Sequence, residues 1–191
     1  YNVAPTQLVP IVRMDKEGRR QVALFAWNFQ PGWAQRSWIN ARAESAWRNR
    51  AFAAAAAGRR CLVPAVGWYE WQGTRTPKQP HVLHLGDFRP FSFAGIWTAR
   101  ELPEGWQHTF AILTRPAEGS IAAIHERMPA VVHPCHYEAW LSTETSAEEA
   151  RGIALEPFGH IEHYAVSNFV NKPEQNDERC IERLRDDAGG R

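Results

Sequence analysis

One carboxylate in residues 61–71 is placed where it could transfer protons. The stretch reads Cys-Leu-Val-Pro-Ala-Val-Gly-Trp-Tyr-Glu-Trp and is typical of a strand, with interruptions at Pro64 and Gly67. Side chains alternate in direction along a strand, so Glu70 shares a face with Trp68. If that face excludes water, burial raises the carboxyl pKa, and such a glutamate transfers protons near neutral pH. The alternative is a glutamate at a strand end with its carboxylate in solvent.

Two further stretches each place a polar or titratable residue two positions before an arginine. Asn40 precedes Arg42, and His125 precedes Arg127. In an extended segment this spacing directs both side chains to one side. Asparagine can orient a substrate, histidine transfers protons near neutral pH and arginine binds anions. Together with Glu70, these residues form a candidate catalytic set.

Each of these residues also has a purely structural interpretation. Asn40 could cap a helix that follows it, and Arg42 could pair with Glu44. His125 could be a hydrogen-bonded histidine of the core. The residues alone leave both interpretations open.

The composition is that of an ordinary globular domain. The chain has 191 residues, of which 44% are hydrophobic and 23% charged, and its formal charge is +1. A charge this small gives no overall sign of polyanion binding, so DNA binding would need a local group of arginines. The nine tryptophans could stack on nucleobases, although core packing is their more common role.

The cysteines and the chain start bear on the cellular setting. Cys61, Cys135 and Cys180 are widely spaced and odd in number, which predicts no disulfide framework and favours a reducing compartment, the cytoplasm. No apolar run reaches membrane-spanning length, and no signal peptide opens the chain. The start at Tyr1, without an initiator methionine, leads us to expect further residues upstream.

Strand patterns dominate the chain, and few helices are expected. The predicted strands, besides residues 61–71, are 8–12, 22–27, 81–85, 91–98, 106–114, 130–132 and 164–166, and the predicted helices are 43–57, 136–141 and 147–155. We expect 8–12 to pair with 22–27, and 81–85 to form a hairpin with 91–98. The pattern lacks the regular crossover helices of a parallel sheet, so it predicts a single α+β domain on a curled, mostly antiparallel, barrel-like sheet with peripheral helices. We expect the charged tail, residues 174–191, to fray.

Several motifs in order resemble one known family. They are Tyr-Asn-Val-Ala-Pro at 1–5, Asn-Ala-Arg-Ala-Glu at 40–44, Cys-Leu-Val-Pro at 61–64, Gly-Trp-Tyr-Glu-Trp at 67–71, Ala-Gly-Ile-Trp at 94–97 and His-Glu-Arg-Met-Pro at 125–129. This set resembles the SRAP (SOS response-associated peptidase) family over residues 1–173. The resemblance implies the same single α+β domain on a curled, mostly antiparallel sheet.

The resemblance implies chemistry on damaged DNA. Members of the family bind an abasic site in single-stranded DNA, or near a junction with duplex, and attach to it covalently. The attacking groups are the amine and thiol of an N-terminal cysteine, which capture the sugar aldehyde as a thiazolidine. Removal of the initiator methionine has been attributed to the same site. We expect no metal or cofactor, and we expect a cytoplasmic monomer.

The matched positions imply a role for each candidate residue. Asn40 would orient the N-terminal residue, Glu70 would transfer protons near its amine, and His125 would assist opening of the sugar ring. The DNA contacts implied for this chain are Arg42, Arg127, Trp33 and Trp68. The sequence departs from the family at one point, because Tyr1 has no thiol. We expect that the chain as written binds DNA without forming the thiazolidine.

Three other interpretations compete with this one. A cysteine hydrolase would use Cys61 as nucleophile and His125 as base, oriented by Glu70, although a thiol on an apolar strand is more typical of a core. A non-catalytic protein could bind single-stranded DNA through arginines and tryptophans alone. A metal site at His133, Cys135 and His136 lacks a second group of ligands at suitable spacing.

Overall fold

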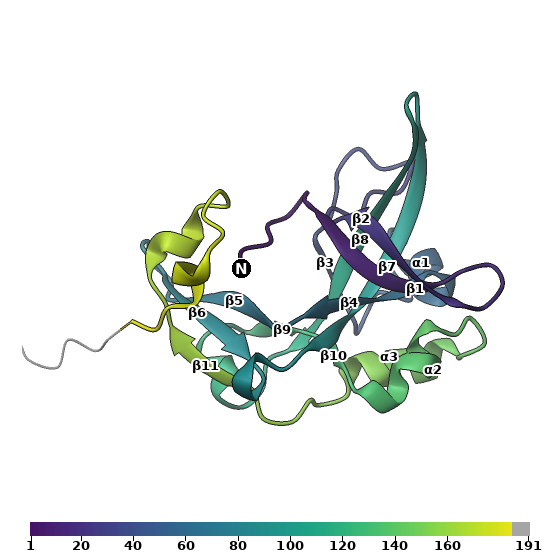
Figure 1. The fold of residues 1–191 in the computed structure, drawn as a ribbon. Helices are drawn as coiled ribbons and strands as arrows, with labels where there is room; N and C mark the ends of the chain where they lie inside the picture. The colour runs from purple at the N-terminus through teal and green to yellow at the C-terminus, as the bar shows by residue number, and fades with distance from the viewer. Residues whose placement is uncertain (185–191) are drawn as a thin grey trace, which may run out of the picture.

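A five-stranded barrel forms the centre of the fold. In the computed structural model, which describes residues 1–184, the ring runs β7–β4–β1–β2–β8 and closes by pairing β8 with β7 (Figure 1). Its strands are β1 (Leu8–Met14), β2 (Arg20–Ala26), β4 (Arg60–Ala65), β7 (Phe91–Leu102) and β8 (Gly105–Pro116). All of the ring's contacts are antiparallel except the short parallel contact between β2 and β8. The predicted curled, mostly antiparallel sheet is confirmed, as is the β1–β2 hairpin.

Short strands extend the barrel sheet beside β8 and β7. These are β3 (Asn40–Arg42), parallel to β8, β9 (Arg127–Pro129), antiparallel to β8, and β10 (Val131–Val132), antiparallel to β7. Arg42 in β3 and Arg127 in β9 therefore lie on strands that both pair with β8. Within Figure 1, the β7–β8 hairpin projects well beyond the barrel.

A second, three-stranded sheet stands to one side of the barrel (Figure 1). It consists of β5 (Gly67–Gln72), β6 (Gln79–His84) and β11 (Glu162–Ala165), with β6 in the middle. Residues 61–71 are thus two strands, β4 and β5, in different sheets, and not one strand as predicted. The break falls at Val66. At Gly67, the first residue of β5, a Cβ atom would lie 2.7 Å from the carbonyl oxygen of Leu83, so only glycine allows β5 to approach β6 this closely.

The hairpin predicted between 81–85 and 91–98 is wrong. Strand β6 pairs with β5 and β11, whereas β7 pairs with β4, β8 and β10. The connection between β6 and β7, a 3₁₀ turn at Gly86–Phe88, holds Asp87 and Phe88 in the left-handed region, with φ of 55° and 52°. This turn leads the chain from the small sheet back to the barrel.

The helices cover the outside of the barrel beside β4, β7 and β10 (Figure 1). They are α1 (Ala53–Gly58), α2 (Tyr137–Leu141) and α3 (Ala147–Leu155). Ser146 caps the N-terminus of α3, because its hydroxyl accepts from the Glu149 amide. The helix predicted over 43–57 is shorter than expected. The amide of Ala43 donates to the Thr114 carbonyl, which continues the β3 pairing, and turns fill residues 44–52.

The C-terminal segment packs further than expected. Residues 174–184 do not fray, because Cys180 is buried with Val166 and Val170 behind the small sheet, and Val166 forms a bridge with Arg183. The rest of the predicted fraying tail, 185–191, lies outside the described residues. Within residues 1–184, each helix is too short or too polar to cross a membrane.

Candidate functional site

Glu70 and His125 meet at the edge of the small sheet. The alternation predicted for β5 is confirmed, because Trp68 packs among residues of the barrel while Tyr69 packs on the opposite face of the small sheet. Glu70 follows Trp68 on the same face, with 17% of its side chain exposed. Its Oε2 lies 3.8 Å from His125 Nδ1. Two residues far apart in sequence, one carboxyl and one imidazole, are thus brought together.

The surroundings of Glu70 shift its proton affinity. Burial raises the pKa of Glu70 to about 7, and the positive charge of a protonated His125 opposes part of this rise. The indole N–H of Trp68 also favours the carboxylate, although it makes no hydrogen bond of normal geometry within the described residues. A carboxyl with this pKa is partly protonated at neutral pH, so it can act both as acid and as base.

His125 is oriented by the main chain that follows it. Its Nδ1 lies 2.9 Å from the carbonyl oxygen of Arg127 and 3.1 Å from the amide nitrogen of the same residue. The side chain is 41% exposed. The ring is therefore held by one nitrogen and open to a ligand from solvent.

Asn40 and Arg42 project from β3 on one side, as predicted. Ala41 between them is buried, and both polar side chains are exposed. Strand β3 places Asn40 opposite Ile112 and Arg42 opposite Thr114 of β8. Within the described residues no hydrogen bond joins Asn40 to Glu70 or His125, whereas Glu70 and His125 lie 3.8 Å apart.

Arg127 differs from Arg42, because its guanidinium is already bound. It pairs with both carboxylate oxygens of Glu44, at 2.9 Å for the Nη2–Oε2 contact, and it donates to the carbonyl and hydroxyl oxygens of Thr114. Glu44 thus pairs with Arg127 and not with Arg42, the partner considered from the sequence. The signal for this pair is absent from the local sequence, since its members lie on opposite sides of β8.

The two candidate tryptophans lie in different environments. Trp33 is 57% exposed, and the guanidinium of Arg50 lies 5.0 Å from its ring centroid. Trp68 is buried and packs edge to face against Phe91 and Phe93, which leaves little of its ring for stacking on DNA. Sequence reasoning missed Arg50, because nothing in the pattern joins it to Trp33.

The cysteine of the hydrolase interpretation lies in the core. Cys61 is fully buried on β4, and burial raises the pKa of its thiol far above the usual range. A thiol that stays protonated and unreachable cannot serve as a nucleophile. This placement contradicts the cysteine hydrolase interpretation.

Within residues 1–184, no three His, Cys, Asp or Glu side chains are grouped so that they could hold a metal ion. His136 Nε2 lies 3.0 Å from Glu156, and His133 Nε2 lies 2.8 Å from the Pro157 carbonyl oxygen. Both imidazoles thus have protein partners on the chain that leaves α3.

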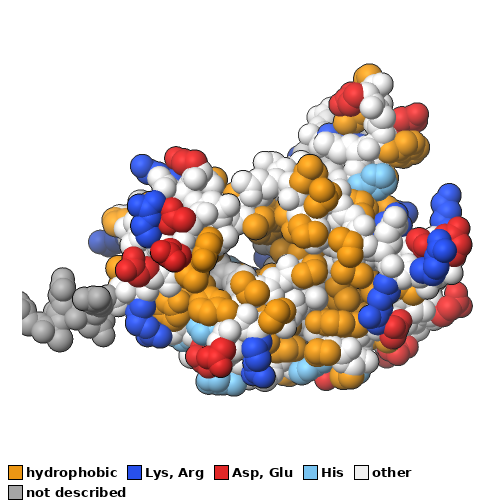
Figure 2. All heavy atoms as spheres, in the orientation of Figure 1, with side chains coloured by type: hydrophobic (Ala, Val, Ile, Leu, Met, Phe, Trp, Pro, Cys, Tyr) orange, Lys and Arg blue, Asp and Glu red, His pale blue; other side chains and the backbone are white. Residues whose placement is uncertain are grey.

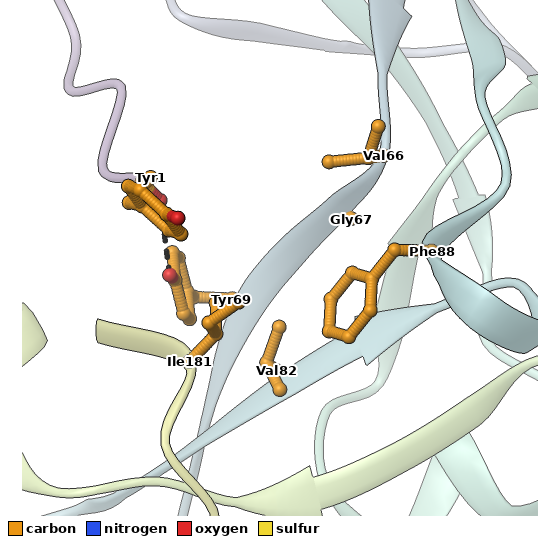
Figure 3. A pocket seen from close by; sticks show the side chains of 7 residues that line it. All are labelled: Tyr1, Val66, Gly67, Tyr69, Val82, Phe88 and Ile181. Carbon is orange, nitrogen blue, oxygen red and sulfur yellow. Dashed lines mark hydrogen bonds between the residues drawn. The ribbon is translucent and has the colours of Figure 1, made fainter. Parts of the chain in front are cut away.

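A cavity of about 450 Å³ lies on the other face of β5 (Figure 3). Tyr69, Val82 and Phe88 line it, and the Tyr69 hydroxyl donates to the Tyr1 carbonyl oxygen. In Figure 2, hydrophobic side chains gather around the hollow between the small sheet and the barrel. The cavity is apolar, and Glu70 does not line it. Glu70 and the cavity therefore lie on opposite faces of β5.

Comparisons with known proteins agree with the motifs. The family described as SOS response associated peptidase (SRAP) matches residues 1–173. The abasic site processing protein YoqW of Bacillus subtilis is 30% identical over 191 residues, covering 95% of this chain and 85% of that protein. The abasic site processing protein YedK of Escherichia coli is 31% identical over 174 residues, covering 89% and 78%.

A solved structure has a similar fold. A crystal structure of a protein from Bacteroides thetaiotaomicron has a TM-score of 0.82 and 26% identity, over 94% of this chain and 82% of that chain. The barrel and the small sheet are thus shared across nearly the whole length. Because the family match spans residues 1–173, this chain belongs to the SOS response-associated peptidase family.

Proposed function

We propose that this protein binds DNA at abasic sites and processes them, with Glu70 and His125 as the proton-transfer pair. The observation that carries the proposal is a carboxyl with a pKa of about 7 lying 3.8 Å from an imidazole. The names of the related proteins YoqW and YedK, both abasic site processing proteins, supply the substrate.

The chemistry of an abasic sugar needs such a pair. Opening the sugar ring removes a proton from the hydroxyl on C1 and delivers one to the ring oxygen, which releases an aldehyde. Groups that titrate near neutral pH are suited to both transfers. Glu70 and His125 can exchange these roles between the forward and reverse directions.

The covalent step belongs to an N-terminal cysteine. Its amine condenses with the aldehyde to an imine and releases water, and its thiol then adds to the imine carbon, closing a thiazolidine. Asn40 would orient the N-terminal residue, and Glu70 would accept the proton of its ammonium group. Tyr1 has no thiol, so the residues described here supply proton transfer and DNA contacts only. Removal of an initiator methionine would use the same pair.

Exposed cations and one exposed indole make up the proposed DNA contacts. Arg42 projects from β3 into solvent, where it can bind a phosphate. Trp33, with Arg50 above its ring, can stack on an unpaired base beside the lesion. Stacking of this kind needs splayed bases, which favours single-stranded DNA or a junction with duplex.

The experiment compares two proteins on single-stranded DNA that contains one abasic site. The first is the chain that starts at Tyr1, and the second is the same chain preceded by an N-terminal segment of a family member that begins with cysteine. On a denaturing gel, we expect a shifted band with the cysteine version only. The absence of a band with either folded protein, together with equal affinity for abasic and intact DNA, would overturn the proposal.

A matched pair of variants tests the DNA contacts. Replacing Arg42 with Gln should weaken binding and reduce the slope of log affinity against log salt by about 0.7, the value for one phosphate on a single strand. Trp33→Ala should weaken binding by about 1–3 kcal/mol without changing this slope. An unchanged slope in Arg42→Gln would remove Arg42 from the phosphate contacts.

A further inference from the structure

The Arg127 guanidinium is fixed on several sides. Its Nη2 donates to Glu44 at 2.9 Å, to the Thr114 carbonyl oxygen at 2.6 Å and to the Thr114 hydroxyl at 3.2 Å, while Nη1 donates to the other oxygen of Glu44. The side chain is only 18% exposed, and its Nε is buried. A guanidinium bound in this way has lost most of its rotational freedom, and its charge is balanced by the carboxylate beside it.

The same residue holds His125 through its main chain. The carbonyl and the amide of Arg127 both lie within hydrogen-bond distance of His125 Nδ1. Strand β9 begins at Arg127 and pairs with the end of β8, where Pro116 is its partner. Any shift of Arg127 therefore moves the atoms that set the direction of the imidazole.

Glu44 links this segment to the other side of β8. It follows β3, and the Ala43 amide before it donates to the Thr114 carbonyl at 2.9 Å. The Arg127 hydrogen bonds are the largest cause of the lowered pKa of Glu44, so the carboxylate is charged at neutral pH. The chain of contacts runs from β3 through Glu44 and Arg127 to His125, across the β8 strand.

We propose that Glu44 and Arg127 are positioning residues, which lock the main chain around His125 so that its imidazole stays at Glu70. This inference rests on the proposed function, because it assigns their part in the same site. Arg42 is exposed, whereas Arg127 holds the segment that contains His125 through its pair with Glu44.

The test reads His125 directly in the protein without DNA. Nitrogen NMR shifts of the neutral His125 imidazole report its tautomer. Glu44→Gln removes the charge that holds Arg127 and keeps the side-chain shape. Glu126→Gln is the matched control, because Glu126 is an exposed carboxylate between His125 and Arg127 and has no ion pair in the described residues. Arg127→Lys repeats the test from the other partner, since lysine cannot form the two-pronged pair.

We expect Glu44→Gln and Arg127→Lys to change the tautomer ratio of His125, and Glu126→Gln to leave it near wild type. The same His125 tautomer ratio in wild type, Glu44→Gln and Arg127→Lys would overturn the inference. Because the readout is taken without DNA, it stands apart from any failure to process abasic sites.

Discussion

Cys61 and Glu70 lie in one continuous stretch of sequence, but the structure places their side chains in different environments. Burial raises the pKa of both acids, that of the thiol and that of the carboxyl. Cys61 lies in the barrel core on β4, fully covered. Glu70 lies on β5 at the edge of the small sheet, partly exposed and 3.8 Å from His125. A raised pKa alone does not make a catalytic group, because proton transfer also requires access for a substrate and a second group to exchange the proton with.

The largest expected effect is a difference in the rate of DNA capture between replacement of Glu70 and replacement of Cys61. In the cysteine version of the protein, Glu70→Gln should lower the rate of covalent capture of abasic DNA by about 10²–10⁴, since the amide cannot transfer the proton. Cys61→Ala should leave the rate per folded molecule near wild type. Rates from single-turnover gel assays measure both. A larger rate loss in Cys61→Ala than in Glu70→Gln would reverse the comparison.

The next effect concerns stability against pH. Because burial raises the pKa of Glu70 from 4.5 to about 7, the folded protein keeps a proton that the unfolded chain loses. The contribution of this proton to the free energy of unfolding is fully present below pH 4.5 and is lost as the pH rises through 7. The difference in unfolding free energy between Glu70→Gln and wild type should therefore depend on pH. Between about pH 4 and about pH 8 it should change by about 1–3 kcal/mol in favour of Glu70→Gln.

Urea unfolding of both proteins at the two pH values measures this difference. Glu126→Gln, at an exposed position, serves as the control and should give the same difference from wild type at both values. A pH-independent difference for Glu70→Gln would show that Glu70 has an ordinary proton affinity.

Cys61→Ala should have a smaller effect, on stability. The thiol sulfur fills space against Gly95, where a Cβ atom would lie 2.7 Å from Sγ. Removing the sulfur leaves a small void and should cost about 1–2 kcal/mol in the free energy of unfolding. Urea unfolding at one pH measures it. A loss below the error of the method would mean that the β4–β7 contact does not depend on this packing.

The smallest effect is one of thiol reactivity. Cys135 is exposed, whereas Cys61 and Cys180 are buried. Iodoacetamide should label Cys135 in the folded protein and leave Cys61 unlabelled, as read by mass spectrometry of peptides. Labelling of Cys61 as fast as Cys135 would restore it as a candidate nucleophile.

Local patterns predicted much of this molecule, and long-range pairing explains the rest. The alternation around Trp68 and Glu70, the first hairpin and the last helix each follow from residues close in sequence. The division of residues 61–71 between two sheets depends on the close approach of Gly67 to Leu83, which no local pattern shows. The Glu44–Arg127 pair and the Arg50–Trp33 contact likewise join separate segments. The sequence could therefore supply the site residues but not their partners.

The most direct test of the Glu70–His125 pair is the pH dependence of capture. Rates of covalent capture of abasic single-stranded DNA by the cysteine version, measured from about pH 5 to about pH 9, should show an inflection near the Glu70 pKa of about 7. The account predicts that Glu70→Gln is slow and lacks this inflection. Wild-type rates in Glu70→Gln across this range would contradict it, because the Glu70 carboxyl would then transfer no proton in the capture step.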